Sequence, residues 1–86
     1  MTENWPHKLI DKTFVKLTIE GNPLNGKVGV LWAVYGLDPV QYEATFFDDN
    51  GEEEYFIFGD EDAEKIEREN VKDQKVLNYF DGLFGN

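Results

Sequence analysis

The chain has 86 residues, of which 41% are apolar and 15% aromatic, and it carries a formal net charge of −10 with no cysteine. This length predicts one domain with a small core, and the content of large apolar side chains argues against disorder. The charge disfavours direct binding to nucleic acid or to an anionic membrane, and the lack of thiols excludes disulfides and thiolate zinc sites.

No segment predicts export or membrane insertion. The first residues lack the apolar core of a signal peptide, and no run approaches the ~18 consecutive apolar residues of a membrane span. Together with the absence of cysteine, this pattern predicts a cytoplasmic protein with no membrane partner.

The first half of the chain predicts an arm and two strands. Residues 1–12 mix polar residues, a proline and scattered apolar positions, which favours an N-terminal arm. Residues 13–20 (TFVKLTIE) alternate apolar and polar side chains, as a half-buried strand does. After a turn-rich segment, residues 27–35 (KVGVLWAVY) are β-branched or aromatic at both parities, which indicates a central strand covered on both faces. Gly29 marks a bulge or a close backbone approach in that strand.

The middle of the chain predicts a hairpin. Residues 40–47 (VQYEATFF) alternate again, and Gln41, Glu43 and Thr45 are expected to face outward. The inward-facing side chains are expected to be Val40, Tyr42, Ala44 and Phe46. Asn50 followed by Gly51, between two strand-like runs, predicts a tight turn into a fourth strand at residues 52–58. The antiparallel sheet is therefore expected to cover residues 13–58.

A helical segment is predicted over residues 60–84. Three acids at 60–62 supply an N-cap and an acidic first turn for a helix at residues 63–69, in which Glu64 and Arg68 are spaced to pair. Residues 71–84 leave two alternatives open. Their apolar positions fit one helical face, which is favoured, but the run KVLNYF also fits a closing fifth strand.

Parts of this pattern resemble small SH3-like barrels of the KOW type. The resemblance is carried by residues 26–31 (GKVGVL) and 42–46 (YEATF), followed by the turn at 48–51 and another apolar strand, and it covers residues 13–66. The expected fold class is therefore mainly β with a C-terminal helix (α+β), as a small antiparallel sheet or an SH3-like partly open barrel. The resemblance implies no activity. Many such barrels bind nucleic acid through basic loops, whereas the loops here are acidic.

The sequence offers no set of residues for catalysis. It contains neither serine nor cysteine, and His7 is its only imidazole, so no nucleophile can be matched with a base. A pair of catalytic carboxylates would need a cleft that a domain of this size rarely has. The chain is predicted not to be an enzyme, to have no catalytic residues and to need no cofactor.

The run DDNGE at residues 48–52 clusters oxygen ligands in one turn. It fails the calcium-binding EF-hand pattern, because Glu53 stands at its sixth position instead of glycine and Gly59 at its twelfth instead of glutamate. We interpret this run as an Asx-stabilised hairpin turn and predict no metal site. A weak divalent-cation-binding protein remains a further alternative.

The negative charge is concentrated in one segment. Residues 38–64 contain eleven acids and no Lys or Arg, whereas the segments on either side are close to neutral. Such crowding is either a solvated surface that keeps the protein soluble or a face that binds a basic partner, and we favour the binding face. Its candidate residues are Asp48, Asp49, Glu52, Glu53, Glu54, Asp60, Glu61 and Asp62.

The main functional hypothesis is a non-catalytic inhibitor or regulator that occupies a basic site on a host protein as a DNA mimic. By type only, the chain is similar to small acidic host-takeover proteins of phages. In the alternative hypothesis it inhibits a host metabolic enzyme or another host protein, gripped through exposed terminal residues. Those residues are Phe80, Leu83 and Phe84. Both hypotheses predict a protein partner, no direct nucleic-acid binding, and a monomer or weak dimer.

Overall fold

The structure is a computed structural model that describes residues 12–36 and 39–85. The predicted N-terminal arm and His7 lie outside the described residues, apart from Lys12. The described strands are β1 (Thr13–Leu17), β2 (Val28–Tyr35), β3 (Gln41–Phe47), β4 (Glu53–Phe58) and β5 (Ala63–Ile66), and the α-helix is α1 (Gln74–Phe84). Two short 3₁₀ helices, η1 (Asp60–Asp62) and η2 (Arg68–Asn70), flank β5. In this part of the chain, no helix has the length and apolar character to span a membrane.

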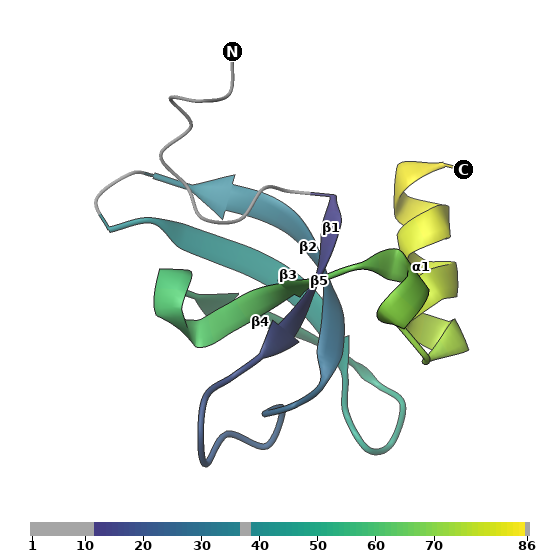
Figure 1. The fold of residues 1–86 in the computed structure, drawn as a ribbon, viewed down its shortest axis with the longest axis horizontal. Coiled ribbons are helices and arrows are strands. Elements are labelled where there is room, and N and C mark those ends of the chain that lie inside the picture. Colours follow the sequence, from purple (N-terminus) through teal and green to yellow (C-terminus); the bar gives the residue numbers. More distant parts are fainter. Residues whose placement is uncertain (1–11, 37–38, 86) are drawn as a thin grey trace.

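The strands form one antiparallel sheet in the order β4-β3-β2-β1-β5, with α1 standing to one side of it (Figure 1). The first four strands form a meander, and β5 returns to pair with the outer side of β1. Strands β4 and β5 are left as the two edges, so the sheet is open and is not a closed barrel. The expected class, a mainly β domain with a C-terminal helix, is confirmed.

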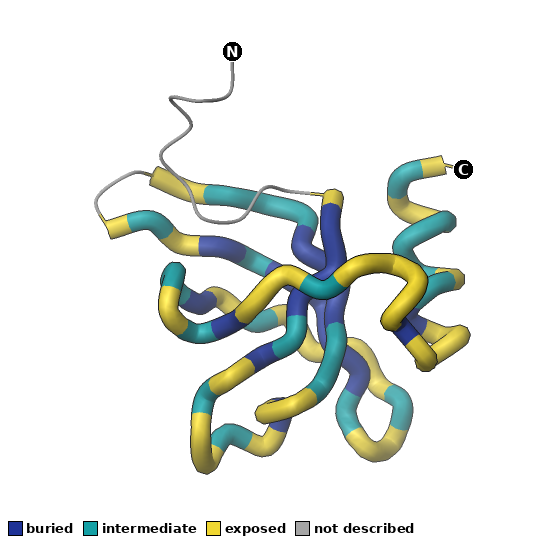
Figure 2. Tube along the Cα trace, in the orientation of Figure 1, coloured by how far each residue is buried: buried dark blue, intermediate teal, exposed yellow. Residues whose placement is uncertain are grey.

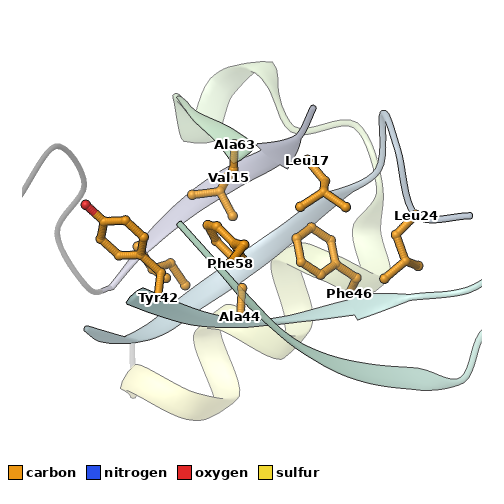
Figure 3. Close-up of a cluster of buried hydrophobic side chains, with 9 residues drawn as sticks. Val15, Leu17, Leu24, Tyr42, Ala44, Phe46, Phe58 and Ala63 are labelled. Carbon is orange, nitrogen blue, oxygen red and sulfur yellow. The ribbon is translucent and has the colours of Figure 1, made fainter. Parts of the chain in front are cut away.

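The larger part of the core lies on one face of the sheet, which we call the concave face. All five strands contribute side chains to one cluster, and Figure 3 shows its labelled members pointing into the same space. The ring of Phe58, from edge strand β4, lies 5.7 Å from the ring of Tyr42 and 6.4 Å from that of Phe46. Ala63, from the opposite edge strand, belongs to the same cluster. Because both edges contribute, the sheet curls over this cluster. The buried strand residues lie mostly on the inner strands β1, β2 and β3 (Figure 2). The inward side chains predicted for residues 40–47 are confirmed.

The helix α1 packs on the opposite face, which we call the helix-side face. Val76 is buried at 2% exposure, and Leu77 and Phe80 pack on the same cluster. The buried strand residues on the sheet side of this contact are Phe14, Val30 and Phe47. Phe80 stacks on Phe14 with ring centroids 4.5 Å apart. Helix is thus confirmed over strand for residues 74–84 of the predicted segment 71–84, because its apolar residues recur on one side at helical spacing.

The helix begins and ends at residues suited to those positions. Asp73 is its N-cap, and its carboxylate accepts the N–H of the second helical residue at 3.0 Å. Gly85 ends the helix in the left-handed region, at φ +69°. Arg68 donates two hydrogen bonds, of 3.1 and 3.0 Å, to Asp81 on α1 and does not form the predicted pair with Glu64.

The helix predicted at residues 63–69 is wrong. Residues Ala63–Ile66 are strand β5, which pairs with β1 from Leu17↔Ala63 to Phe14↔Ile66. Ala63 packs in the concave cluster, whereas Ile66 packs on the helix-side cluster. Residues three apart lie on opposite faces of a strand but on one side of a helix, so only extended backbone lets the two residues pack on different clusters. The sheet therefore extends beyond residue 58, and the three acids predicted as a helix cap form η1.

Gly29 marks a close approach, and the bulge lies elsewhere. A Cβ atom at position 29 would stand 2.5 Å from the backbone oxygen of Thr45 and 2.6 Å from Cδ2 of Phe46. The register of β2 against β3 shifts two residues later, between Leu31 and Ala33. Of the two possibilities that the glycine suggested, the close approach is confirmed at this residue.

Candidate protein-binding site

The helix α1 leaves part of the helix-side face uncovered, where β3 and β4 lie. Tyr55 and Ile57 on β4 are 62% and 51% exposed, although their cross-strand partners on this face belong to the middle of β3. Tyr35 at the end of β2 is 44% exposed, and Leu83 on α1 is 47% exposed. Among the described residues these are the exposed large apolar side chains. All four belong to one surface and not to scattered positions.

A hollow of about 430 Å³ lies where α1 meets this uncovered surface. We call it the aromatic groove, and its lining residues are Trp32, Tyr55, Tyr79, Leu83 and Phe84. The rings of Trp32 and Tyr55 meet edge to face, with centroids 6.4 Å apart. The groove therefore offers aromatic faces from the sheet and an apolar wall from the helix.

Thr45 fixes the rings of the groove from beneath. Its side chain is fully buried, and its Oγ1 accepts Nε1–H of Trp32 at 3.0 Å and lies 3.1 Å from the hydroxyl of Tyr79. The sequence pattern correctly predicts that Thr45 faces away from the concave core. On this sheet, however, α1 and the indole ring cover that face. These hydrogen bonds orient both rings and so fix the shape of the groove.

Two carboxylates stand among these exposed aromatic residues. The hydroxyl of Tyr35 donates to Oε1 of Glu43 at 2.6 Å, and that of Tyr55 donates to Oε1 of Glu53 at 2.9 Å. These hydrogen bonds are the main reason why the pKa of each tyrosine is raised above its usual value near 10. Negative charge thus lies directly beside apolar surface. We call the aromatic groove together with Tyr35, Ile57, Glu43 and Glu53 the helix-side patch.

The acids predicted to form one binding face are divided between two places. Residues 48–54 surround the β3–β4 hairpin, whereas Asp60–Asp62 form η1 beyond the other end of β4. Glu53 and Glu54 begin β4 and η1 follows its end, so at ~3.3 Å per residue the four steps from Glu54 to Phe58 alone separate the two groups by about 13 Å. The structure therefore does not gather the eight predicted acids into one cluster.

Two lysines from elsewhere in the chain approach the acidic hairpin. Nζ of Lys27 lies 2.8 Å from Oδ1 of Asp49, and this contact lowers the pKa of that carboxyl. Nζ of Lys75 on α1 donates to the carbonyl of Gly51 at 2.8 Å and lies 5.3 Å from the ring centroid of Phe47. The segment without bases in the sequence is therefore partly neutralised in three dimensions.

The hairpin turn is the one predicted from Asn50 and Gly51. Oδ1 of Asp48 accepts the backbone N–H groups of Asn50 and Glu52, each at 2.9 Å, and Gly51 has φ +82°. The Asx-turn interpretation is confirmed. In residues 12–36 and 39–85 no group of three or more His, Asp or Glu side chains is placed to hold a metal ion.

The acids of η1 serve mainly to connect β4 to β5. Asp60 accepts the hydroxyl of Tyr42, and Oδ2 of Asp62 accepts the N–H of Gly59 at 2.9 Å. The carbonyl of Asp62 also accepts the N–H of Thr18 at 2.8 Å. Two of the three predicted site residues here have structural partners, and Glu61 is the exposed one.

The structure separates the three terminal residues predicted to bind a partner. Phe80 is half-buried between Phe14 and Phe84, whereas Leu83 and Phe84 line the aromatic groove. The prediction that residues 27–35 are covered on both faces implies a core position for Trp32 and misses its place in the groove. One signal in the sequence was present: the fourth strand, β4, is apolar at both alternating sets of positions, which an edge strand with one solvated face does not require.

No protein family, curated protein or solved structure matches this chain.

Proposed function

We propose that this chain is a non-catalytic protein-binding domain that holds a basic segment of a partner protein in the helix-side patch. One observation carries the proposal: exposed apolar side chains and two carboxylates lie together around the aromatic groove. Large apolar side chains at the centre of an interface supply most of its binding energy, and neighbouring charges select the partner.

The chemistry of the patch favours arginine or lysine from the partner. The faces of Trp32 and Tyr55 attract cations, and an arginine guanidinium can stack on a ring while pairing with a carboxylate. Glu43 and Glu53 each accept a tyrosine hydroxyl through one oxygen, which leaves acceptor sites for a ligand. The net charge of −10 would speed the approach of a basic partner.

The DNA-mimic hypothesis has less support from the geometry. The two acidic groups are separated by residues 55–58 of β4, and Lys27 and Lys75 approach the hairpin. We propose that those acids attract the basic partner over a long range, while the helix-side patch makes the contacts with it. By occupying a basic site on its partner, the domain would inhibit or regulate that protein, in keeping with the function expected from the sequence.

The proposal is tested with a capped heptapeptide of alternating arginine and valine, titrated by calorimetry and by ¹⁵N chemical shifts. We expect the shifts to concentrate at the helix-side patch. Leu83→Ala should weaken binding by at least about fivefold, as the loss of an apolar anchor worth more than 1 kcal/mol does.

A matched pair of charge changes separates the patch from the overall field. Glu53→Gln and Glu61→Gln remove the same charge, but only Glu53 belongs to the patch. We expect the first change to weaken binding about two- to fivefold, as for an exposed ion pair, and the second to have almost no effect. If Glu53→Gln and Glu61→Gln weaken binding equally and Leu83→Ala does not weaken it, the result would instead favour the acidic face as the binding surface. Failure of the peptide to bind would contradict the proposal.

A further inference from the structure

Strand β4 is an edge strand with little protection against pairing. Among the described residues no second strand pairs with its outer side. Its two charged residues, Glu53 and Glu54, stand at the hairpin end, so residues 55–58 (YFIF) contain no charged residue and no proline. Proteins usually blunt an exposed edge with those residues, with a bulge or by making the strand very short. The other edge follows that pattern, since β5 has four residues, carries Glu64 and Lys65 at its centre, and is flanked by η1 and η2.

The register shows which groups of β4 point away from the sheet. Asp48 N–H donates to Glu52 O at 3.0 Å, so residues 48 and 52 form a hydrogen-bonded pair. In an antiparallel ladder such pairs alternate with non-bonded pairs, which places Thr45↔Tyr55 and Glu43↔Ile57 in the non-bonded class. The backbone N–H and C=O groups of Tyr55 and Ile57 therefore face outward, at the residues whose side chains are exposed on the helix-side patch.

A hollow flanks β4 on each face of the sheet. The aromatic groove lies on the helix side, beside Tyr55. A second hollow, of about 360 Å³, lies on the other side, and its lining includes Leu24, Glu54 and Phe56. An extended segment laid along β4 would point alternate side chains toward these two faces. Main-chain bonds to the edge would supply affinity, and the two hollows would select the side chains.

We infer that β4 binds an extended basic segment of the partner protein by strand addition. This inference rests on the proposed function and specifies how the partner binds. The charge around the edge favours a basic occupant over a second copy of this chain. Residues 41–58 contain six acids and no Lys or Arg, so two copies paired through β4 would bring like charges together.

The test uses the full chain and the same alternating arginine–valine heptapeptide, with amide hydrogen exchange followed by NMR. At a peptide concentration ten times its Kd, exchange at Tyr55 and Ile57 should slow about tenfold, because the open edge is then about 9% populated. The amide of Phe56, already bonded to β3, and the amides of edge strand β5 serve as internal controls. At the same peptide concentration, NMR should also show intermolecular contacts between α-protons of the peptide and α-protons of β4.

The outcomes separate this inference from the proposed function. If the peptide binds and shifts the patch while exchange at Tyr55 and Ile57 is unchanged, strand addition is overturned and the proposed function stands. If the peptide does not bind, both fail. If the two amides are already protected in the free protein, and increasingly so at higher protein concentration, a second copy occupies β4 and the inference is overturned.

Discussion

Replacing Gly29 with alanine tests how closely β2 and β3 approach on the concave face. The added Cβ would stand 2.5 Å from the backbone oxygen of Thr45 and 2.6 to 2.8 Å from two ring atoms of Phe46. Thr45 and Phe46 are both fully buried, so neither the carbonyl nor the ring can move without disturbing the core. The methyl group must therefore push the two strands apart or tilt the ring.

Two opposing effects set the size of the change. Alanine is favoured over glycine in a strand by roughly 0.5–1 kcal/mol, because glycine loses more backbone entropy on folding. Overpacking a closely packed core costs roughly 1–3 kcal/mol. We expect the clash to win and the free energy of unfolding to fall by about 1–2 kcal/mol. For a domain of this size, that change lowers Tm by roughly 5–15 °C.

The same substitution at Gly82 provides a matched control. Gly82 lies inside α1, and apart from its chain neighbours and the backbone of its own helix no atom stands within 4 Å of the position that its Cβ would take. Here alanine should raise the free energy of unfolding by roughly 0.5–1 kcal/mol. Urea unfolding, followed by tryptophan fluorescence and far-ultraviolet circular dichroism, measures both variants. If Gly29→Ala is as stable as the parent while Gly82→Ala behaves as expected, the close approach of the strands is wrong.

Three further predictions concern the hydrogen bonds and ion pairs around the site. Thr45→Val removes the hydroxyl that Trp32 and Tyr79 share as a hydrogen-bond partner and should lower the free energy of unfolding by about 1–2 kcal/mol. Thr45→Ser keeps a hydroxyl and should retain most of the stability of the parent, and urea midpoints measure both variants. The pKa of Asp49 is lowered by Lys27, so the stability that this pair contributes should be present above about pH 4 and lost as the carboxyl is protonated at lower pH. Tm values of the parent and Lys27→Gln should accordingly converge below about pH 3, and a gap that persists there would refute the assignment. Glu53→Gln should bring the titration of one tyrosine back toward its usual pKa near 10, seen in the absorbance of tyrosinate, and an unchanged curve would count against the Tyr55 hydrogen bond.

The strands and turns of the meander could be predicted because their signals are local. Apolar and polar side chains alternate at residues 13–17 and 41–47, as in a sheet with a core on one face. This two-residue period can be recognised from adjacent positions in the sequence. Gly51 has positive φ at the hairpin, as the Asn-Gly pair predicts. The helix at the end of the chain followed from the spacing of its apolar residues. In each case the interactions that fix the backbone lie within a few residues of one another.

The wrong prediction of a helix at residues 63–69 shows that local sequence signals do not decide the structure of every segment. Its acidic start and its mixture of charged and apolar residues suit a helix as well as a strand. The deciding factor was the free edge of β1, almost fifty residues earlier, which bonds to β5 and buries Ala63 and Ile66 on opposite faces. A short segment with weak propensity adopts the structure that its long-range partner requires.

The candidate site depended still more on tertiary structure. Composition and the lack of a nucleophile indicated an acidic domain without a catalytic set, and the terminal aromatics pointed toward Leu83 and Phe84. Only the fold placed those two residues beside Trp32 and Tyr55, and only the fold carried Lys27 and Lys75 to the acidic hairpin. The physical reason is that a groove and a local electrostatic field are sums over side chains from separate elements, so they exist only after the sheet has curled and α1 has packed against it.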